Sequence, residues 1–307
     1  MKLFFGEFKS DYDKYRFPYQ VWLLREDGDE VEKIYENGFL PIRSLASVYY
    51  LCRSVRVELS LFEPSSENRR ILKKTEGISA SLVPLSQFNY SVEVQKLCHD
   101  YAEKRLGKDV FPVPAIKSIF SGKIYNQVLV YNRFDKTPQF SAGDEGKARF
   151  QASPETNGKA VESLPEKTLG FQPREAYKSD EDREVGYAVC FVNHDLIQYA
   201  HAFYDLNFLS ENLGARMMLE AVNLAKEREQ KYIYLGTCYQ ESSLYKTEFK
   251  GVEFFNGFSW SKNSDELKKL IQRRGEEFLL KDKEHLEKYY QGDLHQILNN
   301  FGVRVNF

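Results

Sequence analysis

The stretch from residue 187 to 250 constrains the fold of this chain more than any other. Two apolar runs, 187–191 and 196–204, are followed by a helix-like segment at 211–229. A third apolar run, Tyr232-Ile233-Tyr234-Leu235-Gly236, leads into a polar loop that ends in Tyr245-Lys246. The order strand, strand, helix, strand predicts an α/β unit. Its last loop is expected at a sheet edge, where such sheets place their ligand sites.

Composition narrows the class of protein. The 307 residues carry a net charge of −2, so nucleic acid can be bound only through a local basic patch. The apolar run at the N-terminus is too short for a signal peptide. No run of about eighteen apolar residues, the length of a membrane-spanning helix, occurs in the sequence. Four scattered cysteines without Cys-x-x-Cys spacing argue against a zinc site or a disulfide scaffold. We therefore expect a cytoplasmic protein with reduced thiols that does not associate with membranes. We favour a monomer over an oligomer.

The upstream chain predicts further strands and helices. Val55-Arg56-Val57 alternates as a half-buried strand does, and Ser65 is placed to cap the helix that follows it. Asn37-Gly38 is a typical signal for the end of a helix. The remaining expected elements are a helix at 30–36, an extended segment at 39–50, a helix at 92–106, a turn-rich connector at 110–114 and a strand at 128–131.

The helix after Ser65 carries four cations: Arg69, Arg70, Lys73 and Lys74. Positions three or four apart share a helix face, so these side chains form one basic surface. It is either a solvated helix face or a surface that follows a phosphate backbone.

Composition changes twice later in the chain. Residues 134–183 form a polar insertion without long apolar runs, and charged helices are expected at 265–271, 276–290 and 293–301. We predict three parts: an N-terminal domain at 1–85, a second domain at 86–262 that contains the insertion, and a helical C-terminal appendage at 263–307.

Most motifs of familiar chemistry are absent. The sequence has no phosphate-binding GxxxxGK[ST] loop, no GxGxxG, no His-Glu-x-x-His and no Gly-x-Ser-x-Gly. The five histidines show no metal-ligand spacing, so neither a metal nor a cofactor is expected. Asn212-Leu213-Gly214-Ala215 lies at a strand-to-helix junction, where backbone amides favour an anion. Such junctions cradle the pyrophosphate of coenzyme A in GNAT-fold acyltransferases, although an ordinary helix start explains the residues equally well.

The motifs of the 187–250 unit resemble a known family. Phe203-Tyr204-Asp205, Leu213-Gly214, Tyr234-Leu235-Gly236 and Tyr245-Lys246 occur in this order. They are similar to the C-terminal half of aminoacyl-tRNA–protein transferases, the arginyl- and leucyl-transferases of the N-degron pathway.

A second match lies upstream. Cys52-Arg53-Ser54-Val55-Arg56-Val57 and Phe62-Glu63-Pro64-Ser65, followed by Arg69-Arg70-Ile71-Leu72-Lys73, resemble the N-terminal half of the same family. The family's N-terminal cysteine cluster, which can hold a metal or an iron–sulfur centre, is represented here by Cys52 alone. The loop from Gly236 to Tyr245 also lacks the family's Cys-x-Lys-Met element.

The resemblance implies transfer of arginine or leucine from charged tRNA to the α-amine of an acceptor protein that begins with an acidic residue. The ester is already activated, so the reaction needs orientation and help with one proton. Asp205 would accept that proton or hold the α-ammonium group, unless it only caps a turn. Lys246 would meet the terminal phosphate or the acidic acceptor residue, unless it is a solvated lysine.

The resemblance also implies binding roles for further residues. Tyr204, Tyr234 and Tyr245 would stack on the terminal adenine, with core packing as the alternative for the first two. The basic helix would follow the tRNA backbone. The remaining predicted binding residues are Arg56, Leu213, Gly214 and Gly236.

The sequence therefore predicts a mixed α/β protein: a GNAT-like acyltransferase domain behind a small α/β N-terminal domain. Two alternatives remain open at this point. One is an acetyl-CoA-dependent N-acyltransferase on the same fold, and the other is a binding protein without catalytic activity.

Overall fold

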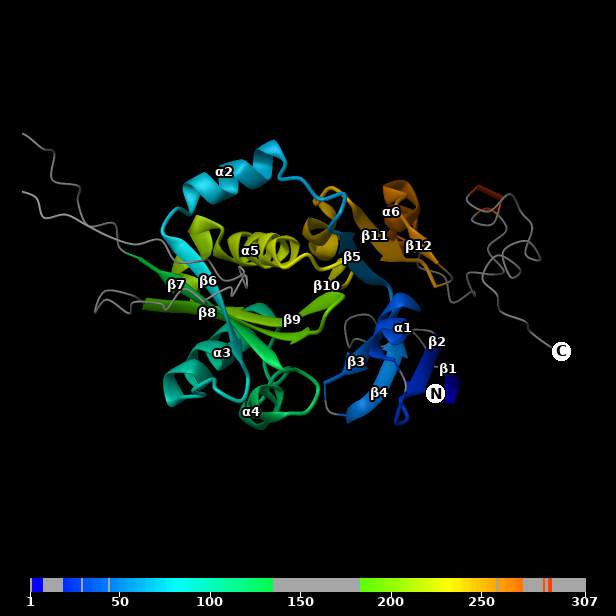
Figure 1. Cartoon of the computed structure of the whole chain (residues 1–307), viewed down its shortest axis with the longest axis horizontal. Helices are drawn as coiled ribbons and strands as arrows, with labels where there is room; N and C mark the ends of the chain where they lie inside the picture. Colours follow the sequence, from blue (N-terminus) through cyan, green and yellow to red (C-terminus); the bar gives the residue numbers. More distant parts are fainter. Residues whose placement is uncertain are drawn as a thin grey trace, which may run out of the picture.

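The computed structural model in Figure 1 describes residues 2–7, 19–28, 30–43, 45–134, 183–257, 259–272, 284 and 287–288. Within these residues the chain is a mixed α/β protein with two sheets. The polar insertion lies outside the described residues except for Phe134 and Arg183. So do nearly all of the helices expected at 276–290 and 293–301. No helix among the described residues is long and apolar enough to cross a membrane.

The smaller sheet is antiparallel and has the strand order β1-β2-β4-β3. Its strands are β1 (Lys2–Glu7), β2 (Tyr19–Leu24), β3 (Phe39–Ile42) and β4 (Leu45–Leu51), and α1 (Val31–Glu36) precedes β3. Gly38 makes the turn between α1 and β3, at a φ of +81° that favours glycine. A Cβ there would lie 2.3 Å from the ring of Phe255, so this turn also packs too closely on the larger sheet for any side chain.

The larger sheet has the order β12-β11-β5-β10-β9-β8-β7-β6. The central β9–β10 pair is parallel and the other pairs are antiparallel. Its strands are β5 (Ser54–Glu58), β6 (Ile78–Pro84), β7 (Gln127–Arg133), β8 (Arg183–Val192), β9 (Leu196–Tyr204), β10 (Tyr232–Thr237), β11 (Val252–Phe255) and β12 (Trp260–Ser261).

Helices cover both faces of the larger sheet (Figure 1). One face carries α2 (Ser66–Lys74) and α5 (Leu213–Glu227), and the other carries α3 (Val92–Arg105) and α4 (Val113–Ser121). Two 3-10 helices, η2 (Leu206–Glu211) and η3 (Glu241–Thr247), follow β9 and β10, and α6 (Ser264–Gln272) follows β12. The core lies between the sheet and these helices, with one apolar cluster on each face.

The strands predicted at 187–191, 196–204 and 232–236 and the helix predicted after Ser65 are confirmed. Ser65 caps α2 and accepts a hydrogen bond from the backbone N–H of Asn68 at 3.1 Å, while the Asn68 side chain accepts one from the N–H of Ser65. The connector predicted at 110–114 already contains the start of α4, because Pro112 is its N-cap. The polar loop after β10 contains the 3-10 turn η3.

The larger sheet joins strands from both sides of the domain boundary predicted near residue 85. β5 and β6 precede that boundary, and the other strands of the sheet follow it. Residues 45–85 therefore divide between the two sheets, and the independent folding of residues 1–85 stays a prediction.

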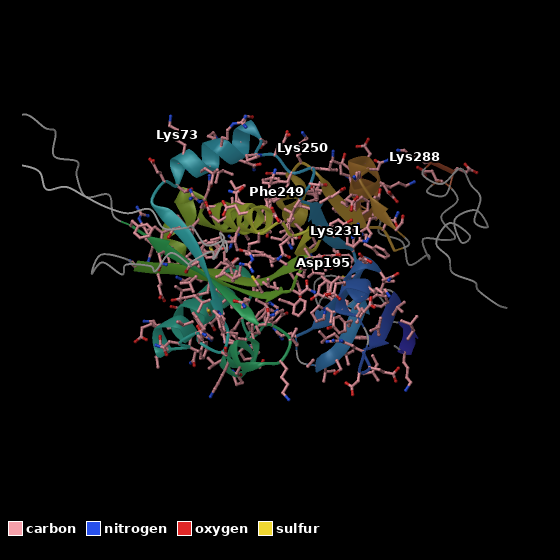
Figure 2. The ribbon with its side chains drawn as sticks, in the orientation of Figure 1. Lys73, Asp195, Lys231, Phe249, Lys250 and Lys288 are labelled. Atoms are coloured by element: carbon pink, nitrogen blue, oxygen red, sulfur yellow. The ribbon has the colours of Figure 1, made fainter. Side chains whose placement is uncertain are left out.

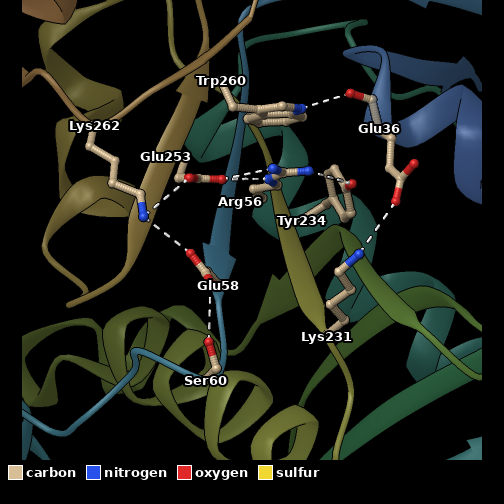
Figure 3. Close-up of polar contacts among 9 residues, drawn as sticks. All are labelled: Glu36, Arg56, Glu58, Ser60, Lys231, Tyr234, Glu253, Trp260 and Lys262. Atoms are coloured by element: carbon tan, nitrogen blue, oxygen red, sulfur yellow. Dashed lines mark hydrogen bonds and ion pairs between the residues drawn. The ribbon is translucent and has the colours of Figure 1, made fainter.

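Arg56 connects the strands at one end of the larger sheet (Figure 3). Its side chain is buried, and its Nε and Nη2 each lie 2.8 Å from Oε2 of Glu253 on β11. The guanidinium also sits 3.8 Å from the ring centre of Tyr232 and 3.9 Å from that of Trp260. Because Trp260 donates a hydrogen bond to the backbone oxygen of Glu36, the network reaches the end of α1 as well.

We predict that Arg56→Met lowers the free energy of unfolding by about 3 kcal/mol or more, since it leaves the Glu253 carboxylate buried without its main partner. Urea denaturation measures this loss. The matched control is Arg70→Met, because Arg70 pairs with Glu67 on the exposed face of α2 at 2.6 Å. Equal midpoints for the two variants would contradict the role given to burial.

Candidate functional site

The parallel strands β9 and β10 part near the middle of the larger sheet. Their pairing ends at Tyr234 opposite Gln198, although β9 continues to Tyr204 and β10 to Thr237. Both strands carry an extra residue at this point. Ala200 of β9 has no partner on β8, and the register of β10 against β5 shifts between Tyr234 and Thr237. Since β-bulges bend a strand, they account for the separation.

Lys246 of η3 lies where β10 leaves its partner. Its ammonium group donates a hydrogen bond to the backbone oxygen of Thr237 at 2.9 Å. Gly236 has a φ of +85°, and a Cβ there would lie 3.5 Å from Nζ of Lys246. Glycine therefore serves the positive-φ turn, and the distance shows that the ammonium lies directly against the strand at this point.

Lys246 is not the solvated loop lysine that was the alternative interpretation. Burial lowers the pKa of Lys246, and the neighbouring thiols of Cys238 and Cys52 partly oppose that shift. Among the described residues no carboxylate forms an ion pair with it. A partly buried ammonium without a counter-charge is costly, and such groups are frequent where an anionic ligand binds.

The first turn of α5 packs against Tyr204. Leu213 is buried, and a Cβ on Gly214 would lie 3.0 Å from the ring of Tyr204, so glycine permits this approach. Asn212 occupies the N-cap position with a φ of 61°, and its side chain caps no backbone amide. The junction predicted at 212–215 is confirmed, whereas its use as an anion site stays a prediction.

Asp205 is held by two contacts at the end of β9. Its carboxylate lies 2.6 Å from Nη2 of Arg183 and accepts a hydrogen bond from the backbone N–H of Asn207 at 3.0 Å. This arrangement forms the turn into η2 and agrees with the turn-capping alternative. Its catalytic role stays a prediction.

The other predicted aromatic and basic residues occupy different environments. Tyr234 is fully buried, packs against Tyr35 and Trp260, and faces the Arg56 network, whereas Tyr245 is 48% exposed. Arg56 is occupied by Glu253 within the core. Arg56 and Tyr234 are thus placed as packing residues, and Tyr245 is placed where a ligand could reach its ring.

The four cations of α2 are all exposed, and Lys73 points outwards in Figure 2. Arg70 pairs with Glu67, and Arg69 donates a hydrogen bond to the backbone oxygen of Pro64 at 2.6 Å. Lys73 and Lys74 occupy the last turn of α2, near the start of α5. The predicted basic surface therefore lies on the same face of the sheet as the first turn of α5.

Arg216, which the sequence did not single out, joins α2 to α5. Its Nη1 donates hydrogen bonds to the backbone oxygens of Leu72 and Thr75, each at 3.0 Å, and its Nη2 donates one to that of Ile78 at 2.7 Å. These carbonyls lie at or beyond the end of α2, where helix carbonyls lack partners. An ion pair with Glu220 at 2.7 Å fixes the guanidinium further.

The structure brings together Lys246 with Gly236, and Tyr204 with Leu213 and Gly214. It places Cys52 of the upstream motif beside Lys246, and it adds two neighbours that no sequence motif indicated, Cys238 beside Lys246 and Tyr101 beside Tyr204. The described residues contain no group of three or more His, Cys, Asp or Glu side chains that could hold a metal ion.

A family model described as "Arginine-tRNA-protein transferase, C terminus" matches residues 126–256. This segment runs from β7 to β11 and includes the point where β9 and β10 part, α5 and Lys246.

Curated relatives and a solved structure were also found. The aspartate/glutamate leucyltransferase of Dinoroseobacter shibae is 25% identical over 219 residues, which are 70% of this chain and 64% of that protein. That of Alkalilimnicola ehrlichii is 21% identical over 251 residues, which are 78% of this chain and 86% of that protein. The structure of L-PGS from Bacillus licheniformis covers 82% of this chain and 73% of its own. Its TM-score is 0.35 and its identity 10%, a likeness too slight to carry an argument.

The chain thus spans slightly less than two thirds of the first of these relatives. The family match covers the central strands, and the relatives extend the similarity over most of the chain. Over residues 126–256 the chain is similar to the arginine-tRNA–protein transferases, and over most of its length it is similar to the aspartate/glutamate leucyltransferases.

Proposed function

We propose that this protein transfers leucine from charged tRNA to the N-terminal α-amine of an acceptor protein that begins with aspartate or glutamate. The observation that carries the proposal is the ammonium of Lys246 at the point where β9 and β10 part, which pairs with no carboxylate of the described residues. The names of the curated relatives, which specify aspartate, glutamate and leucyl transfer, support it. A cytoplasmic location and a GNAT-like arrangement of the parallel pair belong to the same proposal.

The reaction asks the protein mainly for orientation. The neutral amine nitrogen of the acceptor attacks the ester carbonyl carbon, and a C–N bond forms. The C–O bond to the ribose breaks, and the proton lost by the amine ends on the ribose oxygen or in solvent. Holding the two reactants in contact supplies most of the rate enhancement. We assign Asp205 to the turn into η2, since its carboxylate accepts the N–H of Asn207 in that turn and is otherwise paired with Arg183 of β8.

Electrostatics favours leucine over arginine as the transferred amino acid. The titratable groups that act on the pKa values of Tyr101 and Lys246, among the described side chains, are phenols and thiols, which are neutral at physiological pH, and Arg105; no carboxylate is among them. Asp205 follows Tyr204 directly, but its carboxylate is paired with Arg183. An arginyl side chain would bring a further cation without a partner, whereas a leucyl side chain asks only for an apolar surface.

The same charges fit an acidic acceptor. A carboxylate beside Lys246 would supply the counter-charge that the described residues do not provide, and a charge-assisted hydrogen bond is stronger than a neutral one. The terminal phosphate of the tRNA could fill the same place. The acceptor's side chain is the better candidate because the cations of α2 and the first turn of α5 already offer sites for phosphate.

The test is incubation of the protein with leucyl-, arginyl- and bulk aminoacyl-tRNA and with peptides that differ only in their first residue. We expect leucine on peptides that begin with aspartate or glutamate, and little on their asparagine and glutamine counterparts. Acetyl-CoA replaces charged tRNA in a parallel reaction. Acetylation of the peptides without any aminoacyl transfer would overturn the proposal in favour of an acetyl-CoA-dependent enzyme.

We predict that Lys246→Met lowers kcat/KM for an aspartate-starting peptide about 10- to 100-fold, the range expected for one hydrogen bond to a charged group. The asparagine-starting peptide should change little. Steady-state kinetics with both peptides measures this. Equal losses for the two peptides would assign Lys246 to the tRNA or to structure.

The preference for aspartate over asparagine is also expected to depend on pH. Burial lowers the pKa of Lys246, so the ammonium is lost as the pH rises through that lowered pKa, and with it the pairing to a carboxylate. The ratio of kcat/KM for the two peptides should therefore fall as the pH rises towards 10. Deprotonation of the acceptor amine also changes both rates, so each rate is corrected for the amine pKa of its own peptide. A ratio that is the same at all pH values would contradict the prediction.

We predict that joint charge reversal of Arg69 and Lys73 to Glu weakens tRNA binding and lowers the slope of log K against log salt by about 2, because each of the two cations neutralises one phosphate of the tRNA. Filter binding at several salt concentrations measures the slope. The matched control reverses Lys117 and Lys123, which are exposed at α4 on the opposite side of the sheet. Identical slopes in both variants would refute the basic surface.

A further inference from the structure

Tyr101 of α3 touches both faces of β9. Its ring centre lies 5.9 Å from that of Phe203 and 4.7 Å from that of Tyr204. Successive side chains of a strand point to opposite faces of the sheet. A ring that contacts two successive residues therefore lies at the edge of the strand. The ring also packs against the apolar clusters on both sides of the sheet.

Only one edge of β9 can hold this ring. β8 pairs with β9 as far as Gly186 opposite Tyr204, so that edge is occupied. On the other edge the pairing with β10 ends at Gln198, before β9 reaches Phe203 and Tyr204. Tyr101 thus occupies the place beside β9 that β10 has left. It enters the candidate site from α3, which lies on the far face of the sheet.

Tyr245 of η3 approaches the same place. The neighbouring phenols of Tyr204 and Tyr245 add to burial in raising the pKa of Tyr101, and Tyr245 and Tyr101 act in the same direction on the pKa of Tyr199. Tyr101 is partly exposed, and Tyr245 is 48% exposed. Tyr204, which is buried, lies beside the Tyr101 ring and close to Gly214 in the first turn of α5.

We propose that Tyr101 is a substrate-binding residue and that its ring, together with that of Tyr245, forms the surface on which the terminal adenine of the charged tRNA stacks. This inference rests on the proposed function. Neutral phenol rings suit a nucleobase, since every base has a π-face that stacks on an aromatic side chain. Arg105 lies one helical turn after Tyr101 on the exposed side of α3, within reach of a phosphate of the same strand.

The arrangement orders the donor along the protein. The adenine lies at Tyr101 and Tyr245, and the phosphates continue past the first turn of α5 towards Lys73 and Lys74 at the end of α2. The ester is then left at the parting of β9 and β10, beside Lys246. Tyr101 lies outside the segment that the family model matches.

The experiment compares three leucyl donors: leucyl-tRNA, leucyl-adenosine, and leucine methyl ester, which has no base. We expect Tyr101→Ala to raise KM about 5- to 150-fold for the two donors that contain adenine, the range measured for one base–aromatic stack. KM for the methyl ester and for the acceptor peptide should stay unchanged. Tyr101→Phe keeps the ring and should restore KM to near the wild-type value.

Tyr90→Ala is the matched control, because Tyr90 packs on Phe120 in the same α3–α4 layer but makes no contact with Tyr204 or Tyr245 among those described. Equal losses of Tyr101→Ala with all three donors would overturn the stacking role, and so would equal effects of Tyr101→Ala and Tyr90→Ala. If the wild-type protein transfers leucine from none of the three donors, the proposed function itself is refuted. The charge-reversed α2 variant separates the two surfaces, since it should bind leucyl-tRNA weakly and leucyl-adenosine normally.

Discussion

The separation of β9 from β10 is the constraint on which the rest of the site depends. Parallel neighbours in the middle of a sheet normally pair along their length, and here both strands bulge and part after a short register. The separation gives Lys246 a place beside Gly236 and admits Tyr101 to the edge of β9. It needs rigid surroundings, which β8 provides on one side and the buried Arg56–Glu253 pair on the other.

Much of this fold could be predicted from local signals. The apolar runs at 187–191, 196–204 and 232–236 and the cap at Ser65 all indicated elements that the structure contains. Sheet order could not be predicted in this way. β5 lies between β10 and β11, which follow it by more than 170 residues, and local patterns carry no record of such pairing. The independence of residues 1–85 could not be judged from sequence for the same reason.

The candidate site was predictable where a family motif marked it and obscure elsewhere. Lys246, Tyr204 and Gly214 were found through motifs, and the structure shows what each touches. The same motifs could not separate Arg56 and Tyr234, which are buried in a packing network, from residues that face a ligand. Tyr101 and Arg216 carried no signal at all. Each acts through a partner distant in the sequence, so only the folded chain reveals it.

The contact of Arg216 with the end of α2 affects how the basic surface of α2 would recognise a tRNA. One guanidinium joins the carbonyl end of α2 to the first turn of α5 and so sets the position of one helix against the other. Nine residues of α-helix extend about 13 Å, so the spacing from the basic surface to the site is fixed. A fixed spacing of this kind recognises the geometry of a phosphate backbone and does not depend on the base sequence. In the proposed function, therefore, the protein would discriminate between charged tRNAs by the amino acid esterified to the 3′ end. The body of the tRNA would contribute binding affinity without sequence specificity.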